Sequence, residues 1–280
     1  MIETACLLLL FYVLLAPRVA LPFYNTMIFY PHKYPGGRYD VDQIEGVKRQ
    51  DVFFRSANGK LLHAWLFKHP DSRAAILVSH GNAGNLSYRI GLISLLLRAG
   101  ASVMVYDYQG YGRSEGSPSL SGILEDGRAA YNYLVEQERL PAEAVVLHGE
   151  SLGSLVASHL AATVACGGVI LQSGLASFKR IALEALPFLR LYPSWLFPDL
   201  ALDNAAVFET AHPPLLLVHG ARDDIIAIGH SEEIYARALS PKAFTTLPEA
   251  GHNDIYEVNA DRYQEAVGQL LRYIERRSSR

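Results

Sequence analysis

The chain of 280 residues has few cysteines, little net charge and no metal-binding motif. Its two cysteines, Cys6 and Cys166, cannot make a disulfide scaffold. No H-E-x-x-H or C-x-x-C motif and no metal-like spacing of His, Cys or Glu occurs, so we expect no zinc enzyme and predict no metal or other cofactor. The net charge of −3 leaves no basic excess for nucleic acid, and we expect no nucleic-acid partner.

Apolar residues are plentiful instead. Hydrophobic residues make up 50% of the chain, which excludes wholesale disorder. The length is enough to bury a full core in one large α/β domain or in two small ones.

The first thirty residues differ from the rest by their long apolar runs. Residues 5–16 are uncharged and almost wholly apolar, Pro17-Arg18 interrupt them, and apolar character returns at 19–23. A spanning helix needs about 20 apolar residues, which this run reaches only if it continues to Phe29. We expect residues 1–30 to anchor the protein to a membrane through a transmembrane helix; a cleaved signal peptide and a segment packed on the core are the alternatives. Basic residues follow the segment and none precedes it, which favours a cytoplasmic side for the rest of the chain.

From about Val47 onward, short apolar runs alternate with helical patterns. The strands are expected at 51–55, 61–67, 74–79, 102–106, 144–147, 168–171, 214–219 and 243–247, and the helices at 88–98, 120–138, 154–164, 230–239 and 259–276. Asn58-Gly59 between the first two strands predicts a hairpin, because both residues tolerate positive φ. The predicted fold class is α/β, with a mostly parallel central sheet, helices on both faces and antiparallel strands at one edge.

One long excursion breaks this alternation between Leu171 and Leu215. It is rich in proline, and its segment 187–200 carries aromatic and leucine side chains. Long insertions in compact domains are usually functional, so we expect a small cap at about 175–212 whose apolar side chains, Trp195 and Phe197 among them, shape a pocket. A pair of surface helices packed on the sheet is the alternative.

Gly149-Glu150-Ser151-Leu152-Gly153 forms a G-x-S-x-G motif between a predicted buried strand and a predicted small-residue helix. In this context the motif is typical of a sharp turn that holds a nucleophilic serine at a helix N-terminus, and the glycines permit the turn. Ser151 is therefore the candidate nucleophile. A tight glycine-rich turn with an incidental serine is the alternative.

A nucleophilic serine needs a base and an orienting acid, and both follow later strands in the expected order. Asp223-Asp224 lies in the loop after the strand at 214–219, and His252 lies after the last strand. Such loops meet at the carboxyl edge of the sheet, where ligands bind in open α/β folds. We assign His252 as the base, with His230 as the fallback.

A second glycine-containing loop, His80-Gly81-Asn82-Ala83-Gly84, follows the strand at 74–79. An oxyanion hole needs two N–H donors, and we assign the backbone amides of Asn82 and Leu152 to it. An ordinary strand-to-helix loop is the alternative. The loop at 107–116 offers no nucleophile, and we expect Asp107 and Arg113 to anchor backbone there.

Together these motifs resemble the α/β-hydrolase superfamily over about residues 47–276. The chain is similar to the serine-aminopeptidase-like branch, and within it to membrane-anchored α/β-hydrolase-domain proteins, a group that includes protein depalmitoylases. The resemblance implies an α/β-hydrolase domain with a cap insertion, and it implies that the triad acid is Asp223 rather than Asp224. The sequence departs from the family pattern at Ile225-Ile226-Ala227, where relatives often carry a proline.

The motifs and the resemblance predict a serine hydrolase that cleaves an acyl ester or thioester with the triad Ser151, Asp223 and His252. The apolar cap and N-terminal segment favour a lipid-like acyl substrate, although the segment is not expected to build the site, since every candidate residue lies beyond Gly46. An aminopeptidase or amidase is the first alternative, and it needs an acidic side chain near the site to bind an ammonium group. A non-catalytic binding module on the same fold is the second.

Overall fold

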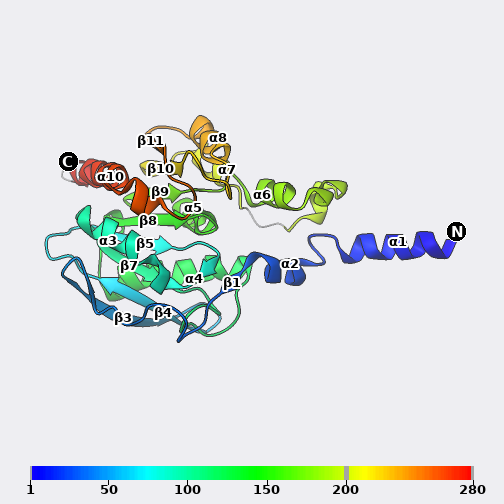
Figure 1. Cartoon of the computed structure of the whole chain (residues 1–280), viewed down its shortest axis with the longest axis horizontal. Helices are drawn as coiled ribbons and strands as arrows, with labels where there is room; N and C mark the ends of the chain where they lie inside the picture. The colour runs from blue at the N-terminus through cyan, green and yellow to red at the C-terminus, as the bar shows by residue number, and fades with distance from the viewer. Residues whose placement is uncertain (1, 199–201, 279–280) are drawn as a thin grey trace.

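A computed structural model describes residues 2–198 and 202–278 of the chain. Its helices are α1 (Ile2–Leu14), α2 (Leu21–Ile28), α3 (Ile90–Arg98), α4 (Leu120–Asn132), α5 (Gly153–Thr163), α6 (Phe178–Ala185), α7 (Asn204–Phe208), α8 (Gly229–Arg237), α9 (Ile255–Val258) and α10 (Ala260–Ser278). Its strands are β1 (Tyr30–Pro31), β2 (Gln43–Ile44), β3 (Val47–Arg55), β4 (Leu61–Phe67), β5 (Ala75–Ser79), β6 (Ala83–Gly84), β7 (Ser102–Tyr106), β8 (Val145–Glu150), β9 (Gly168–Gln172), β10 (Leu215–Gly220) and β11 (Lys242–Leu247). Figure 1 shows how the helices surround the strands.

Among the described residues, nine strands form the central sheet in the order β11-β10-β9-β8-β5-β7-β4-β3-β2. The strands from β11 to β7 are parallel, and β4, β3 and β2 continue the sheet antiparallel at one edge. β3 and β4 pair Arg55 with Leu61 across a loop in which Gly59 adopts a φ of 81°. The predicted mostly parallel sheet with an antiparallel edge is confirmed.

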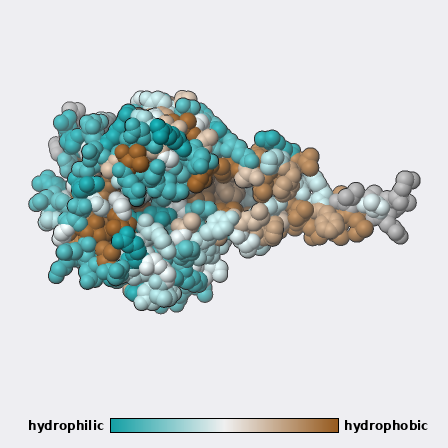
Figure 2. Space-filling model, viewed as in Figure 1, coloured by the Kyte–Doolittle hydropathy of each residue, from teal (hydrophilic) through white to brown (hydrophobic). Residues whose placement is uncertain are grey.

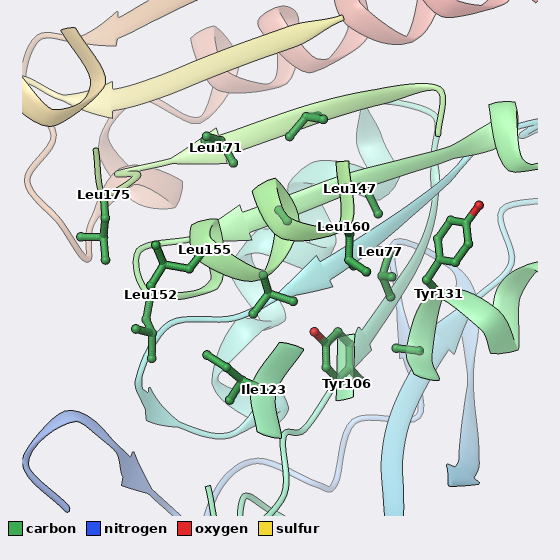
Figure 3. Packing of buried hydrophobic residues seen from close by; sticks show 14 of the residues in the cluster. Leu77, Tyr106, Ile123, Tyr131, Leu147, Leu152, Leu155, Leu160, Leu171 and Leu175 are labelled. Carbon is green, nitrogen blue, oxygen red and sulfur yellow. The ribbon is translucent and has the colours of Figure 1, made fainter. Parts of the chain in front are cut away.

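Two apolar layers fill the space between the sheet and its helices. Along β5, Ile76 and Val78 belong to the layer under α3 and α10, and Leu77 belongs to the layer under α4 and α5. This alternation follows because successive side chains of a strand point to opposite faces. Figure 3 shows Leu77 and Leu171 of the sheet and Leu155 and Leu160 of α5 as members of one of these layers. Each fully buried aliphatic side chain contributes about 1.5–3 kcal/mol, so the two layers hold the strand ends, and the loops that leave them, in fixed positions.

The first two helices project from the body of the molecule beside the cap (Figure 1). α1 ends at Leu14 and α2 begins at Leu21, because Pro17 between them cannot continue a helix. No helix among the described residues is long and apolar enough to cross a membrane. The prediction of a transmembrane helix is therefore wrong: the break divides the apolar run into helices of 13 and 8 residues, and a span needs about 20.

Residues 178–198, the part of the predicted cap that begins with α6, pack against these N-terminal helices. After α6 the chain continues in short helical turns at Pro187–Leu191 and Ser194–Leu196. Tyr12 of α1 stacks on Tyr192 with 4.5 Å between the ring centroids, and its hydroxyl donates to the Leu191 carbonyl at 2.9 Å. Together the cap and the N-terminal helices bury Ala16 and Tyr24 in a small apolar core outside the sheet.

The cap is shorter than the insertion predicted at 175–212. Residues 199–201 of that insertion lie outside the described residues. From α7 onward the chain packs on the body, where the Asn204 amide donates to the Leu175 carbonyl at 2.7 Å and to the Ser154 hydroxyl at 3.1 Å. We use "the cap" below for residues 178–198.

Candidate active site

Ser151 lies on a sharp turn between β8 and α5. Its φ is 52°, a left-handed value that residues with a side chain rarely adopt. Glycine is needed on both sides of the turn, since a Cβ on Gly149 would lie 2.5 Å from Ser154 Cα and one on Gly153 would lie 2.0 Å from the Ser79 carbonyl oxygen. The strand–turn–helix that the motif predicted is therefore present, and Ser151 stands at the N-terminus of α5.

Asp223 and His252 lie on the loops after β10 and β11 and are hydrogen bonded to each other. His252 Nδ1 lies 2.7 Å from Asp223 Oδ2. The other carboxylate oxygen accepts the amides of Ile225 and Ile226 at 3.0 and 2.8 Å. Asp224 is exposed, so the fold brings Asp223, not its neighbour, to the imidazole.

A second imidazole supports the Asp223 carboxylate from the buried side. His219 Nε2 lies 3.3 Å from Asp223 Oδ2 and donates to the Ile226 carbonyl at 2.8 Å, while its Nδ1 accepts from the Ser231 hydroxyl at 2.7 Å. Burial alone would raise the pKa of Asp223, but the hydrogen bonds from both imidazoles and from a backbone amide outweigh it and hold the pKa well below its usual range. Asp223 therefore stays ionised beside His252. Nothing in the sequence marks His219 as a partner of Asp223.

Ser151 and His252 share the wall of a cavity of about 630 Å³. Within the described residues no hydrogen bond joins the Ser151 hydroxyl to the His252 ring. Such contacts are often long before a substrate binds. The cavity is thus the feature that brings the candidate nucleophile and the candidate base together.

Most of the cavity wall is apolar, and its residues come from three parts of the chain. They are Pro17, Leu21, Tyr24, Met27 and Ile28 of the N-terminal segment, Phe178, Ile181, Ala182, Ala185, Leu186, Leu189, Phe197 and Pro198 of the cap, and Leu152, Leu175, Ile225 and Ile226 of the body. Two expectations need correction here. The N-terminal segment does contribute to the site, because side chains of α2 line the cavity. Trp195 does not line the cavity but is 69% exposed.

The loop that carries Asn82 is held from two directions. The Asn82 carbonyl accepts the Tyr111 hydroxyl at 2.6 Å and the Tyr30 amide at 2.9 Å, and the Asn82 side chain donates to the Ile28 carbonyl at 2.9 Å. Asn82 and Leu152 both line the cavity, and within the described residues neither backbone amide donates a hydrogen bond. Two amides are therefore available at the cavity wall, and the N-terminal segment helps to hold one of them.

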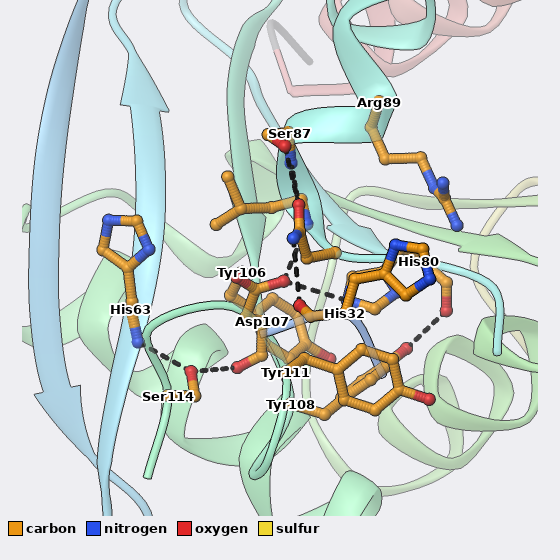
Figure 4. A network of polar contacts seen from close by, with 12 residues as sticks. His32, His63, His80, Ser87, Arg89, Tyr106, Asp107, Tyr108, Tyr111 and Ser114 are labelled. Carbon is orange, nitrogen blue, oxygen red and sulfur yellow. Dashed lines mark hydrogen bonds and ion pairs between the residues drawn. The ribbon is translucent and has the colours of Figure 1, made fainter. Parts of the chain in front are cut away.

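A buried polar network fixes the same loop from behind (Figure 4). Asp107 accepts the Leu86 amide at 2.7 Å and lies 3.4 Å from His80 Nε2, and the Tyr108 hydroxyl donates to the His80 carbonyl at 2.8 Å. Asp107 thus anchors backbone, as expected from the sequence. Arg113 differs from the expectation: it lies over the ring of Tyr34, 4.2 Å from its centroid.

Arg89 and Glu150 form an ion pair at the polar end of the cavity, which sequence reasoning missed. Arg89 Nε lies 2.7 Å from Glu150 Oε2, and the guanidinium also donates to the Ala83 carbonyl at 3.0 Å. Burial alone would raise the pKa of Glu150, but Arg89, followed by the nearby imidazoles, lowers it below its usual range. Glu150 was visible in the G-x-S-x-G motif, but nothing in the sequence marks Arg89 as its partner.

The fallback base His230 lies away from the cavity. Its Nδ1 accepts the Ala176 amide at 3.0 Å and its Nε2 lies 2.9 Å from Glu184 of the cap, so both ring nitrogens are engaged in packing α6 against α8. Among residues 2–198 and 202–278, no group of three or more His, Cys, Asp or Glu side chains is placed to hold a metal ion.

Comparison with known proteins agrees with this fold. A family model described as "alpha/beta hydrolase fold" matches residues 74–211. An uncharacterized protein of Mycobacterium tuberculosis is 35% identical over 210 residues, which cover 73% of each chain, and an uncharacterized membrane protein of Saccharomyces cerevisiae is 29% identical over 82% of this chain and 84% of its own. The solved esterase Pf2001 of Pyrococcus furiosus has the same fold, with a TM-score of 0.72 at 18% identity over 88% of this chain and 98% of its own. With its sheet order, its serine on a strand–turn–helix and these matches, the chain belongs to the alpha/beta hydrolase fold family.

Proposed function

We propose that this protein is a serine hydrolase that cleaves carboxylic esters or thioesters with an apolar acyl group. The observation that carries the proposal is the shared cavity wall: Ser151 on its strained turn and His252, hydrogen bonded to Asp223, border one apolar cavity. A nucleophile and a base held at one cavity, with the base oriented by an ionised acid, is the arrangement that acyl transfer requires. The fold shared with the Pyrococcus esterase is consistent with this reaction class.

In the proposed mechanism, Ser151 Oγ attacks the acyl carbonyl carbon while His252 Nε2 takes the hydroxyl proton. Asp223 accepts the hydrogen bond from His252 Nδ1, which fixes the tautomer and stabilises the imidazolium. The amides of Asn82 and Leu152 stabilise the oxyanion. His252 then protonates the departing alkoxide or thiolate, and the acyl group stays on Ser151. A water molecule, deprotonated by His252, attacks this acyl-enzyme and releases the acid.

The charges around the cavity disfavour the aminopeptidase alternative. Glu150 lines the cavity, but its carboxylate is already paired with Arg89, and Asp224 is exposed and absent from the wall. A substrate ammonium group would have to displace a guanidinium that is largely buried. An uncharged acyl group fits the rest of the wall better, since burying each methylene is worth about 0.8 kcal/mol.

We also propose that the protein works at a membrane. The apolar N-terminal segment supports membrane association, and the yeast relative is named a membrane protein. A lipid-like acyl substrate would then lie in the same membrane with which the enzyme associates.

Labelling with a fluorophosphonate probe tests the assignment of Ser151. We expect the wild-type protein to be labelled and Ser151→Ala to lose both the label and at least about 10⁴-fold in kcat on p-nitrophenyl butyrate, with its fold retained. Ser117→Ala is the control, because Ser117 is exposed and remote from the cavity wall. Continued labelling of Ser151→Ala at another serine would overturn the assignment.

The reaction class is tested with a panel of substrates. We expect p-nitrophenyl esters and acyl thioesters to be hydrolysed, with kcat/KM rising with acyl length until the cavity is full, and aminoacyl p-nitroanilides to be poor substrates. A preference for the anilides would favour the aminopeptidase instead.

A further inference from the structure

Apolar side chains are exposed together at the end of the molecule formed by the N-terminal helices and the cap. We call the exposed large apolar side chains of residues 7–27 and 188–195 the apolar tip; they include Leu10, Phe11, Leu14, Phe23, Leu191 and Trp195. Figure 2 shows apolar side chains gathered over this end, whereas most of the body in view is hydrophilic. Isolated exposed apolar residues are ordinary, but a contiguous apolar surface marks a site of interaction.

The two halves of the apolar tip are held together as one surface. Besides the stacked rings of Tyr12 and Tyr192, the Arg18 amide donates to the Leu196 carbonyl at 2.8 Å, and the Arg18 guanidinium donates to the Trp195 carbonyl at 3.4 Å. These contacts join α1 and the turn after it to the end of the cap. The tip is therefore a composite surface, and the N-terminal segment is only part of it.

The charges beside the apolar tip point to one kind of partner. Residues 2–28 and 178–198 carry four Lys and Arg against two acidic residues, although the whole chain has a net charge of −3. Arg180 is paired with Glu184 and with Glu233 of the body, so the remaining excess is small but positive. An apolar surface that carries Trp, on segments with a net positive charge, is complementary to a bilayer with anionic headgroups. Two copies of the tip packed against each other would instead bring two positively charged segments together.

The same elements form both the tip and the cavity wall. Met27 lines the cavity and is 42% exposed, so the cavity wall reaches the surface at this residue. Next to it on α2, Phe23 is exposed on the tip, while Tyr24 lines the cavity. α2 therefore contributes both to the apolar tip and to the wall of the cavity that Ser151 lines.

We propose that the apolar tip rests on the surface of an anionic lipid bilayer, and that the acyl chain of the substrate passes from the bilayer into the cavity past Met27. This inference rests on the proposed hydrolase function for the identity of the substrate. The docking itself is independent of that function, because it depends on residues outside the candidate triad.

Cosedimentation of the full-length protein with vesicles tests the docking. We expect binding to vesicles of equal parts phosphatidylcholine and phosphatidylglycerol, weaker binding to phosphatidylcholine alone, and partial release by added salt. Leu191→Glu and Trp195→Glu should each lower the partition coefficient about tenfold or more, since each places a charge on the docked face. Leu239→Glu is the matched control and should bind as the wild type does, because Leu239 is also an exposed leucine, at 48% exposure, but lies on the body.

Two further measurements keep the docking separate from the chemistry. All three variants should hydrolyse p-nitrophenyl acetate as the wild type does, and Leu191→Glu and Trp195→Glu should lose hydrolysis of a long-chain ester presented in vesicles. Absence of acetate hydrolysis in the wild type would overturn the proposed function and leave the vesicle result standing. Equal vesicle binding by Leu191→Glu and Leu239→Glu would overturn the docking. A wild-type dimer that Leu191→Glu converts to a monomer, without vesicle binding, would instead assign the tip to a second copy.

Discussion

The carboxylate of Asp223 receives hydrogen bonds from two imidazoles and two backbone amides, and this set of partners determines what a substitution does. Asparagine keeps the size but loses the charge, and its amide no longer favours the tautomer of His252 that accepts a proton at Nε2. We expect Asp223→Asn to lower kcat by about 10³–10⁴-fold. Asp224→Asn, at the exposed neighbour, should leave kcat close to that of the wild type. Steady-state kinetics on a p-nitrophenyl ester checks both, and a larger loss in Asp224→Asn reverses the assignment.

His148 makes the stability of the fold depend on pH. The ring is buried in β8, its Nε2 lies 2.7 Å from the Tyr263 hydroxyl, and burial lowers its pKa from 6.5 to about 4. As the pH falls below 6.5 the unfolded chain takes up a proton on this ring, while the folded protein does not until about pH 4. The unfolded state then binds more protons, so the free energy of unfolding decreases through this window.

Urea unfolding at pH 7.5 and at pH 5 measures this effect. At 1.36 kcal/mol per unit of pKa difference, the His148 ring accounts for a loss of about 2 kcal/mol between these two values. We expect His148→Gln, which keeps an N–H donor for Tyr263, to be less stable at pH 7.5 but to lose about 2 kcal/mol less on acidification. Equal losses in the two proteins would show that other groups carry the acid sensitivity.

The end of the cap presents one aromatic side chain to the cavity and another to the solvent. Phe197 lines the cavity, whereas Trp195, two residues earlier, is exposed. We expect Phe197→Ala to lower the ratio of kcat/KM for octanoyl over acetyl p-nitrophenyl esters about tenfold, because part of the apolar contact with the acyl chain is lost. Trp195→Ala should leave this ratio unchanged. A lowered ratio in Trp195→Ala would mean that the cap rearranges around the acyl chain.

For the molecule as a whole, the N-terminal segment contributes to the cavity wall but little to the core. Deleting residues 1–23 removes Pro17 and Leu21 from the cavity wall, while the two layers that pack the central sheet keep nearly all their residues. We expect the shortened protein to stay folded, to retain hydrolysis of p-nitrophenyl acetate and to lose the rise of kcat/KM with acyl length. Circular dichroism and the same ester series provide the measurement. A shortened protein with the wild-type chain-length profile would show that the segment does not contribute to acyl selection.

Features that depend on local backbone requirements could be predicted from the amino-acid sequence. The G-x-S-x-G turn could be predicted because Gly149 and Gly153 lie where a side chain would collide with neighbouring backbone. The alternation of buried strands and helices could be predicted because a strand covered on both faces must be apolar throughout. Ser151, Asp223 and His252 could be selected as candidates because each comes directly after a predicted strand, in the chain order serine, aspartate, histidine.

The way in which distant segments share one site could not be predicted from the sequence and became visible in the folded structure. The apolar residues at 2–28 have the same composition whether they face lipid, a core or a cavity. The sequence pattern therefore allowed a membrane span where the chain forms two short helices and part of a cavity wall. The same holds for two pairs of side chains, Arg89 with Glu150 and His219 with Asp223. Which side chains meet in these pairs is set by how the strands and loops pack. Contacts of this kind depend on the relative positions of whole elements, and those positions are settled by burial over the entire core rather than by any local run of residues.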